Sequence, residues 1–180
     1  MHQIDVANWV AGKAPLRAAG NGGRQARNMG YIWDHFAVEF EYENGLRFYS
    51  YCRQTTGCEG GISEVVHGTK GFANLDGTIR VKEGQGQSWR YRGENASPYV
   101  LEHLDNIKAI RSGQPLNEAR TAAESTATAI LGREAAYSGQ RIEFDEIMNQ
   151  KTSTQPAKLA WDAPPPKGEI PVPGRYKVAA

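Results

Sequence analysis

Two groups of side chains in this sequence have residue types and spacing that suit chemistry. The first is the pair His2 and Asp5, separated by two residues. On a helix, residues three apart share a face, so a carboxylate at Asp5 could orient the imidazole of His2. A random pair with this spacing is usually a surface pair with no joint task. The spacing alone therefore makes His2 a weak candidate for an acid–base group.

The second group is the run Tyr31-Ile32-Trp33-Asp34-His35, at the entrance to the first long predicted strand. An aromatic face with neighbouring donors and acceptors suits a polyol, which has an apolar face edged by hydroxyl groups. The hairpin described next places Arg53 and Gln54 beside this run. An ordinary strand start with surface polar residues explains the same run about equally well, and both interpretations stay open.

The element that positions this second group is a predicted hairpin. Residues 36–43 alternate between apolar and polar, Asn44-Gly45 follows, and residues 46–53 return. Asn-Gly between alternating runs is a strong hairpin signal, because both turn residues must take positive φ. The two-residue turn predicts that Tyr42 faces Arg47, Phe40 faces Tyr49, Val38 faces Tyr51 and Phe36 faces Arg53. One face would then be an aromatic floor of Phe36, Val38, Phe40, Tyr42, Tyr49 and Tyr51.

The remaining elements follow from caps and turn residues. A short helix should precede Gly12, a first strand should cover 16–19, and a glycine-rich loop should cover 20–30. Ser97-Pro98 and Gly113 bound one helix, and Asn117 and Gly139 bound a second, longer one with small residues on its buried face. Further strands are expected at 62–67, 72–75, 78–82, 88–92 and 141–144, and a helical turn at 145–149.

These elements predict an α+β fold, with a large open, mostly antiparallel sheet and two main helices packed on one face. Residues 1–150 should form one domain. Residues 151–180 hold most of the prolines and predict an extended tail, anchored by Trp161 on the surface. Plain disorder of this tail is an almost equally supported alternative.

Composition excludes several classes of function. The net charge of +1 and the lack of a basic stripe argue against a nucleic-acid partner. No apolar run is long enough to cross a membrane, and the first residues do not form a signal peptide, so the cytoplasm is the default location.

Cys52 and Cys58 have neither redox-pair nor zinc spacing, which favours free thiols over a disulfide. No metal site and no glycine fingerprint for a nucleotide are visible.

Five segments, taken in order, resemble one family. They are residues 2–15, 31–54, 64–75 and 99–144, together with Ile-Pro-Val-Pro-Gly at 170–174. The family is that of glucose–fructose oxidoreductase, inositol dehydrogenase and the rhizopine-catabolism proteins, written Gfo/Idh/MocA. The similarity covers nearly the whole chain, and its nearest branch is bacterial, with members that often carry export signals. A periplasmic location would follow if a longer precursor of this chain carried such a signal.

The resemblance implies a substrate-binding domain that normally follows a Rossmann domain for NAD or NADP. His2 matches the histidine of the family's catalytic set, whose aspartate and lysine would lie before Met1. This chain is therefore expected to be inactive alone, to bind no nucleotide by itself, and to form a homo-oligomer through its sheet, with a sugar or polyol as substrate. The expected substrate-side residues are Arg24, Tyr31, Asp34, His35, Arg53 and Gln54.

Two alternatives to a sugar or polyol dehydrogenase stay open. Some members of the family use NAD in a transient oxidation and hydrolyse glycosides without net redox change. A non-catalytic carbohydrate-binding or assembly module is the alternative from a different class. The sequence does not name the sugar or choose between NAD and NADP.

Overall fold

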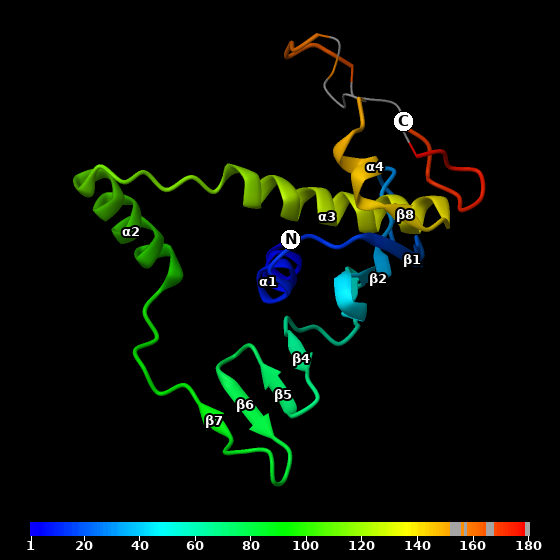
Figure 1. Cartoon of the computed structure of the whole chain (residues 1–180). Coiled ribbons are helices and arrows are strands. Elements are labelled where there is room, and N and C mark those ends of the chain that lie inside the picture. The colour runs from blue at the N-terminus through cyan, green and yellow to red at the C-terminus, as the bar shows by residue number, and fades with distance from the viewer. Residues whose placement is uncertain (152–155, 157, 165–167, 179–180) are drawn as a thin grey trace. The chain divides into compact units, whose positions relative to one another are not determined.

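The computed structural model describes residues 1–151, 156, 158–164 and 168–178. It divides into two compact units, one of Met1–Cys58 with Thr121–Ala180 and one of Glu59–Arg120 (Figure 1). The elements are α1 (His2–Ala11), β1 (Arg17–Gly23), β2 (His35–Glu41), η1 (Glu43–Gly45), β3 (Arg47–Arg53), β4 (Val65–His67), β5 (Gly71–Asn74), β6 (Thr78–Val81), β7 (Trp89–Arg90), α2 (Pro98–Ser112), α3 (Ala119–Ser138), β8 (Ile142–Glu143) and α4 (Phe144–Met148).

The α+β class and the antiparallel pairing are confirmed, with the strands divided between two sheets. The first sheet has the order β3-β2-β1-β8 and belongs to the first unit, and the second has the order β4-β5-β6-β7. β1 runs on through Gly20–Gly23, where a loop was predicted. A side chain at Gly22 would overlap the carbonyl oxygen of His35 on β2, so glycine allows this close pairing.

The predicted register of the β2–β3 hairpin is wrong by one residue. Glu41 pairs with Arg47, and Tyr42 N donates to Leu46 O at 2.9 Å, so three residues (η1) form the connection instead of two. A one-residue slip moves the side chains of the returning strand to the opposite face. The observed partners are Phe40 with Phe48, Val38 with Ser50, Phe36 with Cys52 and His35 with Arg53.

The predicted aromatic floor is therefore split between the two faces of the first sheet. Phe40 stacks on Phe48, with ring centroids 5.6 Å apart, on the face that packs in the core. Tyr49 and Tyr51 lie on the opposite face, where their exposed fractions are 54% and 76%. The open face thus carries two large aromatic residues that were predicted on the same face as Val38 and Phe40.

Helix α3 covers the core face of the first sheet. Its Ala127, Leu131 and Ala135 are buried in one cluster with residues of β1 and β2. A Cβ atom at Gly132 would lie 2.7 Å from Cζ of Phe40, which is closer than side chains pack. The predicted small residues on this helix therefore do permit a close helix–sheet approach.

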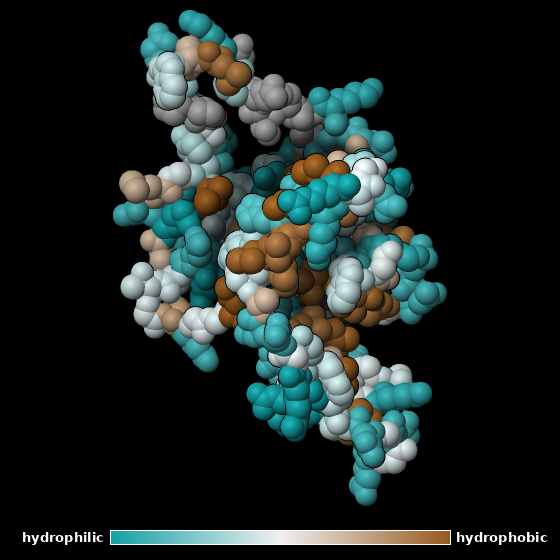
Figure 2. Space-filling model, turned by 90° about the vertical axis from the view of Figure 1, so that its left-hand side faces the viewer, coloured by the Kyte–Doolittle hydropathy of each residue, from teal (hydrophilic) through white to brown (hydrophobic). Residues whose placement is uncertain are grey.

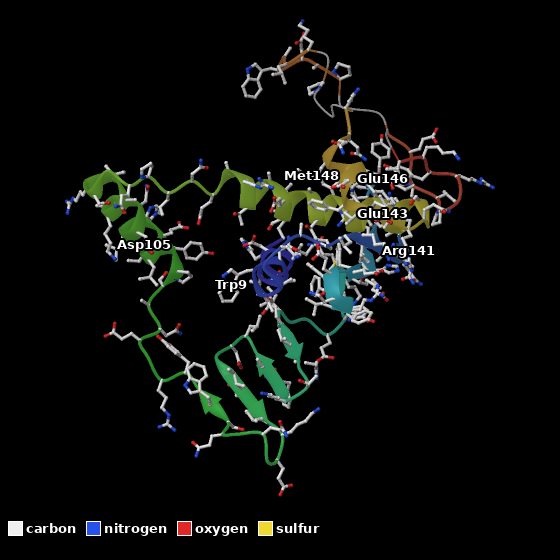
Figure 3. The ribbon with its side chains drawn as sticks, viewed as in Figure 1. Trp9, Asp105, Arg141, Glu143, Glu146 and Met148 are labelled. Carbon is white, nitrogen blue, oxygen red and sulfur yellow. The ribbon has the colours of Figure 1, made fainter. Side chains whose placement is uncertain are left out.

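Helix α1 is joined to this core by a buried polar network centred on Asn8. Tyr42 donates its hydroxyl to Oδ1 of Asn8 at 2.7 Å, and Nδ2 of Asn8 donates to Thr128 Oγ1 at 3.0 Å and to Ser125 Oγ at 3.4 Å. The donors and acceptors satisfy one another, as buried polar groups require. The adjacent Trp9 points away from the helix and is 80% exposed (Figure 3).

The C-terminal residues 171–176 pack against the end of α3. Trp33 Nε1 donates to Pro171 O at 3.1 Å, and Tyr176 donates its hydroxyl to Glu134 at 2.7 Å. Tyr137 lies edge-on to both rings, with centroids 4.9 Å from Trp33 and 5.5 Å from Tyr176. The prediction that Trp161 anchors the C-terminal tail is wrong, because its side chain is fully exposed.

The second unit, Glu59–Arg120, holds the second sheet and α2. The predicted bounds of α2 are confirmed, with Ser97 at the N-cap position, Pro98 in the first turn and Gly113 in left-handed conformation at the end, although the Ser97 side chain makes no capping hydrogen bond. Many of its apolar side chains are exposed, including Leu101, Leu104 and Ile107. Figure 2 shows one face of the whole chain, where hydrophobic residues, in brown, lie at the surface among hydrophilic ones.

Two further sequence expectations concern cysteines and membranes. Cys52 and Cys58 are both free and exposed. In the described part of the chain, no helix combines the length and apolarity needed to cross a bilayer.

Candidate functional site

The candidate site lies at one edge of the first sheet. β1 ends at Gly23, β2 begins at His35 and β3 ends at Arg53, and the register aligns these three residues. The residues that follow or precede them, Arg24, Asp34 and Gln54, therefore gather at the same edge. Gln54 N donates to Asp34 O at 2.8 Å and Asp34 N to Gly23 O at 3.0 Å, which extends the pairing by one residue.

The side chain of Asp34 is buried and organises the loop between β1 and β2. Its Oδ2 accepts the backbone N–H groups of Gln25, Ala26 and Arg27 at 2.7–2.9 Å. Its Oδ1 lies 2.8 Å from Nδ1 of His35. The hydrogen bond with His35, followed by those from the backbone, holds the pKa of Asp34 well below its usual range. The carboxylate is thus ionised and fully engaged.

The imidazole of His35 lies beside this carboxylate. Because Nδ1 faces the carboxylate, it carries the proton, and Nε2 is then the nitrogen that can accept or deliver one. Within the described residues Nε2 has no hydrogen-bond partner, and the side chain is 39% exposed. A Cβ atom at Gly23 would lie 3.2 Å from Cε1 of the ring, so glycine leaves room for this imidazole.

Two arginines occupy the loop held by Asp34. Arg24 donates through Nε to Arg27 O at 2.7 Å and through Nη1 to Gly30 O. Arg27 donates through Nη2 to Oε1 of Gln54 at 3.1 Å. Arg27 was not among the residues predicted for the site. Its position three residues after Arg24 in the same polar loop was the only available signal.

Tyr31 and Arg53 lie at the margin of this cluster. The ring of Tyr31 is 45% exposed and contacts Gly168, where a Cβ atom would lie 3.0 Å from the ring. Arg53 is exposed and pairs with His35 in the strand register. Arg53 therefore lies beside His35 in the sheet, whereas Tyr31 is three residues before Asp34 in the chain and its ring packs on Gly168.

His2 is not joined to this cluster by any contact of the described residues. It is the exposed first residue of α1, and Asp5, which could have oriented it, accepts a hydrogen bond from Ser125 Oγ instead. Asn8 of α1 contacts Tyr42, the residue that follows β2. The seven residues of β2 separate Tyr42 from Asp34, which corresponds to about 25 Å along the extended strand. The role of His2 stays a prediction.

The residues present do not fit the family's nucleotide site. A dinucleotide fingerprint needs glycines in a tight turn from a strand into a helix, whose N-terminus holds the pyrophosphate. In the described chain, Gly20, Gly22 and Gly23 lie inside β1, and β8 passes into α4 without a glycine. The described residues therefore have no role in holding a nucleotide in the manner of a Rossmann domain. The described residues also contain no cluster of three or more His, Cys, Asp or Glu side chains that could hold a metal ion.

Comparison with known proteins identifies the class to which this chain belongs. Residues 1–144 match the family model described as "Oxidoreductase family, C-terminal alpha/beta domain". The chain belongs to this family, Gfo/Idh/MocA, as its sequence motifs indicated. A search of curated proteins found no match.

Several solved structures share the fold. An oxidoreductase from Thermotoga maritima has a TM-score of 0.60 at 17% identity, covering 81% of this chain and 43% of its own. Aldose–aldose oxidoreductase from Caulobacter crescentus, complexed with glycerol, has a TM-score of 0.58 at 15% identity, covering 79% and 45%. Scyllo-inositol dehydrogenase from Lactobacillus casei, with bound NAD(H) and scyllo-inositol, has a TM-score of 0.57 at 18% identity, covering 80% and 46%. The chain thus spans less than half the length of these proteins.

Proposed function

We propose that this chain is the substrate-binding part of an NAD(P)-dependent oxidoreductase that acts on a sugar or polyol. The nucleotide would be held by a Rossmann domain that these 180 residues do not contain. The observation that carries the proposal is the Asp34–His35 pair, at 2.8 Å, on a sheet edge of this family's domain. Relatives of the same fold are complexed with scyllo-inositol and with glycerol, which supports a polyhydroxy ligand.

The site offers a polyol both of the contacts that it needs. Nε2 of His35 accepts from or donates to a hydroxyl group, and Asp34 keeps the ring oriented for that contact. The half-exposed ring of Tyr31 offers a face for the apolar side of the ligand. Gln54 adds amide donors beside Arg27. His2 would act as the acid–base group, or its orienter, on the reacting hydroxyl in the assembled enzyme.

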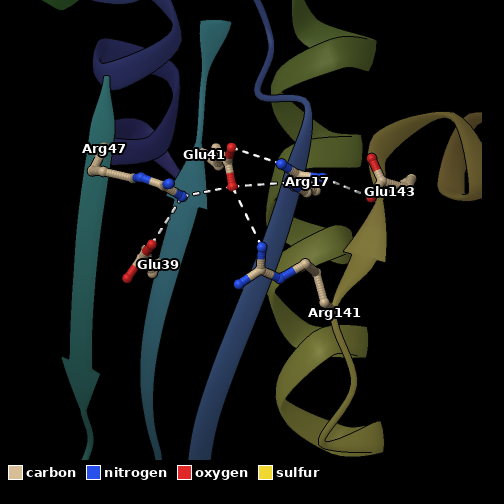
Figure 4. A network of polar contacts seen from close by, with 6 residues as sticks. All are labelled: Arg17, Glu39, Glu41, Arg47, Arg141 and Glu143. Atoms are coloured by element: carbon tan, nitrogen blue, oxygen red, sulfur yellow. Dashed lines mark hydrogen bonds and ion pairs between the residues drawn. The ribbon is translucent and has the colours of Figure 1, made fainter. Parts of the chain in front are cut away.

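The open face of the first sheet is proposed as the surface through which copies of the chain associate. It carries the exposed Tyr49 and Tyr51 and a network of ion pairs around Glu41 (Figure 4). Arg17 binds Glu41 through two hydrogen bonds of 2.8 Å, and Arg47 donates to it at 2.6 Å. Aromatic residues flanked by arginines are typical of protein interfaces. Light scattering should detect an oligomer, and a strict monomer at high concentration would contradict this part.

Calorimetric titration of the 180-residue chain with scyllo-inositol, hexitols and their sugar acids tests the substrate proposal. We expect binding to at least one of these ligands. His35→Asn should weaken it at least tenfold, because asparagine can still donate to Asp34 but lacks Nε2. His103→Asn is the matched control, since His103 is exposed and lies 3.9 Å from the Glu102 carboxylate, away from the candidate site in sequence. Failure of every polyol and sugar acid to bind would overturn the proposed function.

A further inference from the structure

The candidate site holds more positive than negative charge. Arg24 and Arg27 lie in its loop, and within the described residues neither has a carboxylate at ion-pair distance. The carboxylate of Asp34 is occupied by three backbone N–H groups and by His35. The arginines of the open sheet face differ, since Arg17 and Arg47 both pair with Glu41. The charge of the loop is thus left for something outside the described chain to neutralise.

Arg27 also has an unused buried donor. Its Nε is buried and has no hydrogen-bond partner among the described residues. Its Nη2 donates only to a neutral amide oxygen, Oε1 of Gln54, at 3.1 Å. A buried cationic donor without a partner is costly, so such groups in native proteins usually have a ligand or water. A guanidinium with free donors is the group best suited to a planar carboxylate.

We infer that the ligand of this site is a polyol that carries a carboxylate, such as an aldonic or uronic acid, and that Arg27 binds this carboxylate. The inference rests on the proposed function and narrows its substrate class. The hydroxyl groups of the ligand lie toward His35, and the acid group lies toward Arg27 and the free amide hydrogens of Gln54. Arg24 donates through Nε and Nη1 to the carbonyls of Arg27 and Gly30. It therefore holds the loop in place and adds its positive charge to the site.

A carboxylate fits these donors better than a phosphate. A phosphate group has three terminal oxygens and nearly two charges, and proteins usually surround it with several donors or a helix N-terminus. The loop offers the free donors of one arginine and one amide, since the N–H groups of residues 25–27 already point at Asp34. A sugar phosphate is therefore the alternative that the experiment must separate.

The test compares matched ligands on the 180-residue chain by calorimetric titration. D-Gluconate and D-glucitol differ only in a carboxylate against a hydroxymethyl group, and galactonate with galactitol gives a second pair. Glucitol 6-phosphate is the phosphate arm, and acetate measures binding of a bare carboxylate. We expect at least one acid to bind about 10- to 100-fold more tightly than its neutral partner, the effect of one charge-assisted hydrogen-bonding pair.

Variants assign that preference to Arg27. Arg27→Gln should abolish the preference for the acid over its neutral partner, and Arg27→Lys should restore part of it. Arg111→Gln, an exposed arginine of α2, should change neither. Equal binding of acid and neutral partner to the wild-type chain overturns the inference while the polyol site stands. Tighter binding of the phosphate or of acetate alone also overturns it, and no binding of any polyol or acid overturns the proposed function as well.

Discussion

Oδ1 of Asp34 lies 2.8 Å from Nδ1 of His35, while Oδ2 of the same carboxylate holds three backbone N–H groups of the preceding loop. One buried side chain thus fixes both the tautomer of the imidazole and the path of the loop that carries Arg24 and Arg27. The orientation of the His35 imidazole and the path of the cationic loop are coupled through this residue. A change at Asp34 should therefore affect the fold and the site together.

Asp34→Asn should destabilise the chain. The amide removes the negative charge that four N–H groups share, and it places its own donor against a donor on the loop or on His35. We expect the midpoint of thermal unfolding to fall by roughly 5 °C. Asp105→Asn is the control, because the carboxylate of Asp105 is 61% exposed and pairs with the exposed Lys108 at 3.2 Å. Equal midpoints for the two variants would show that the loop does not depend on the Asp34 carboxylate.

Glu41→Gln should change the response of stability to acid. Hydrogen bonds from Arg17, then those from Arg47, lower the pKa of Glu41 to about 2. The pKa of a glutamate in the unfolded chain is about 4.3, so the ionised side chain stabilises the fold above that pH. This contribution is lost as the pH falls from about 4 to 2. Urea unfolding at pH 7, 4, 3 and 2 should show wild type and variant converging in acid.

The control for this series is Glu43→Gln. Glu43 pairs with Lys13 at 2.6 Å, but both side chains are about half exposed, and such surface pairs contribute little. Its unfolding free energy should follow that of the wild type at each pH. A parallel offset of Glu41→Gln from the wild type down to pH 2 would contradict the assignment.

Gly132→Ala should destabilise the chain although alanine favours helices. Alanine gains about 1 kcal/mol over glycine in a helix interior. Its methyl group would meet Cζ of Phe40 at 2.7 Å, however, and such overpacking costs about 1–3 kcal/mol. Phe40→Leu removes that ring atom, so the double variant should recover part of the loss. Urea unfolding of the two single variants and the double variant measures the coupling, and additive effects would argue against the contact.

Tyr176→Phe should loosen the C-terminal residues that support Trp33. The hydroxyl donates to the buried Glu134 at 2.7 Å, and its loss should cost about 1–2 kcal/mol. Trypsin cleavage after Arg175 and Lys177 should become faster. Tyr99→Phe, on an exposed tyrosine, should leave the cleavage rate unchanged. An unchanged rate in Tyr176→Phe would show that this hydrogen bond does not hold the segment.

The same tyrosine predicts a response to alkali. Burial, and then the neighbouring Glu134, raises the pKa of Tyr176 to about 12. The folded chain therefore keeps the phenol proton that the unfolded chain releases near pH 10. Stability from this group is present below pH 10 and is lost between about pH 10 and 12. Denaturant unfolding of Tyr176→Phe over that interval should show a shallower decline than the wild type.

Local signals in the sequence predicted the helices well. Pro98 and Gly113 bound α2 to within one residue, and the small residues of α3 indicated its close approach to a sheet. The hairpin register failed, because Asn44-Gly45 has the expected positive φ values but lies in a three-residue connection. The predicted loop was wrong at Gly20–Gly23, which belong to β1. Pairing with β2 there overrides the weak strand propensity of glycine.

The candidate site was only partly accessible to sequence reasoning. Asp34, His35 and Gln54 lie together as predicted, even though the register is shifted by one residue. Arg27 was missed because its importance arises from charge balance, and a linear sequence does not show that Asp34 is already saturated by backbone donors. The supports from Pro171 and Tyr176 were also missed, since no local pattern encodes contacts across such long separations.

Trp33 and the carbonyl of Pro171, which it contacts, are 138 residues apart in the chain. A ribosome adds roughly 5–20 residues each second, so about 7 to 30 s pass between the synthesis of the two partners. Throughout that interval the indole beside Asp34 has no acceptor from this segment and its ring cluster lacks Tyr176. The order of synthesis therefore delays this support of Trp33 until Pro171 and Tyr176 have been made.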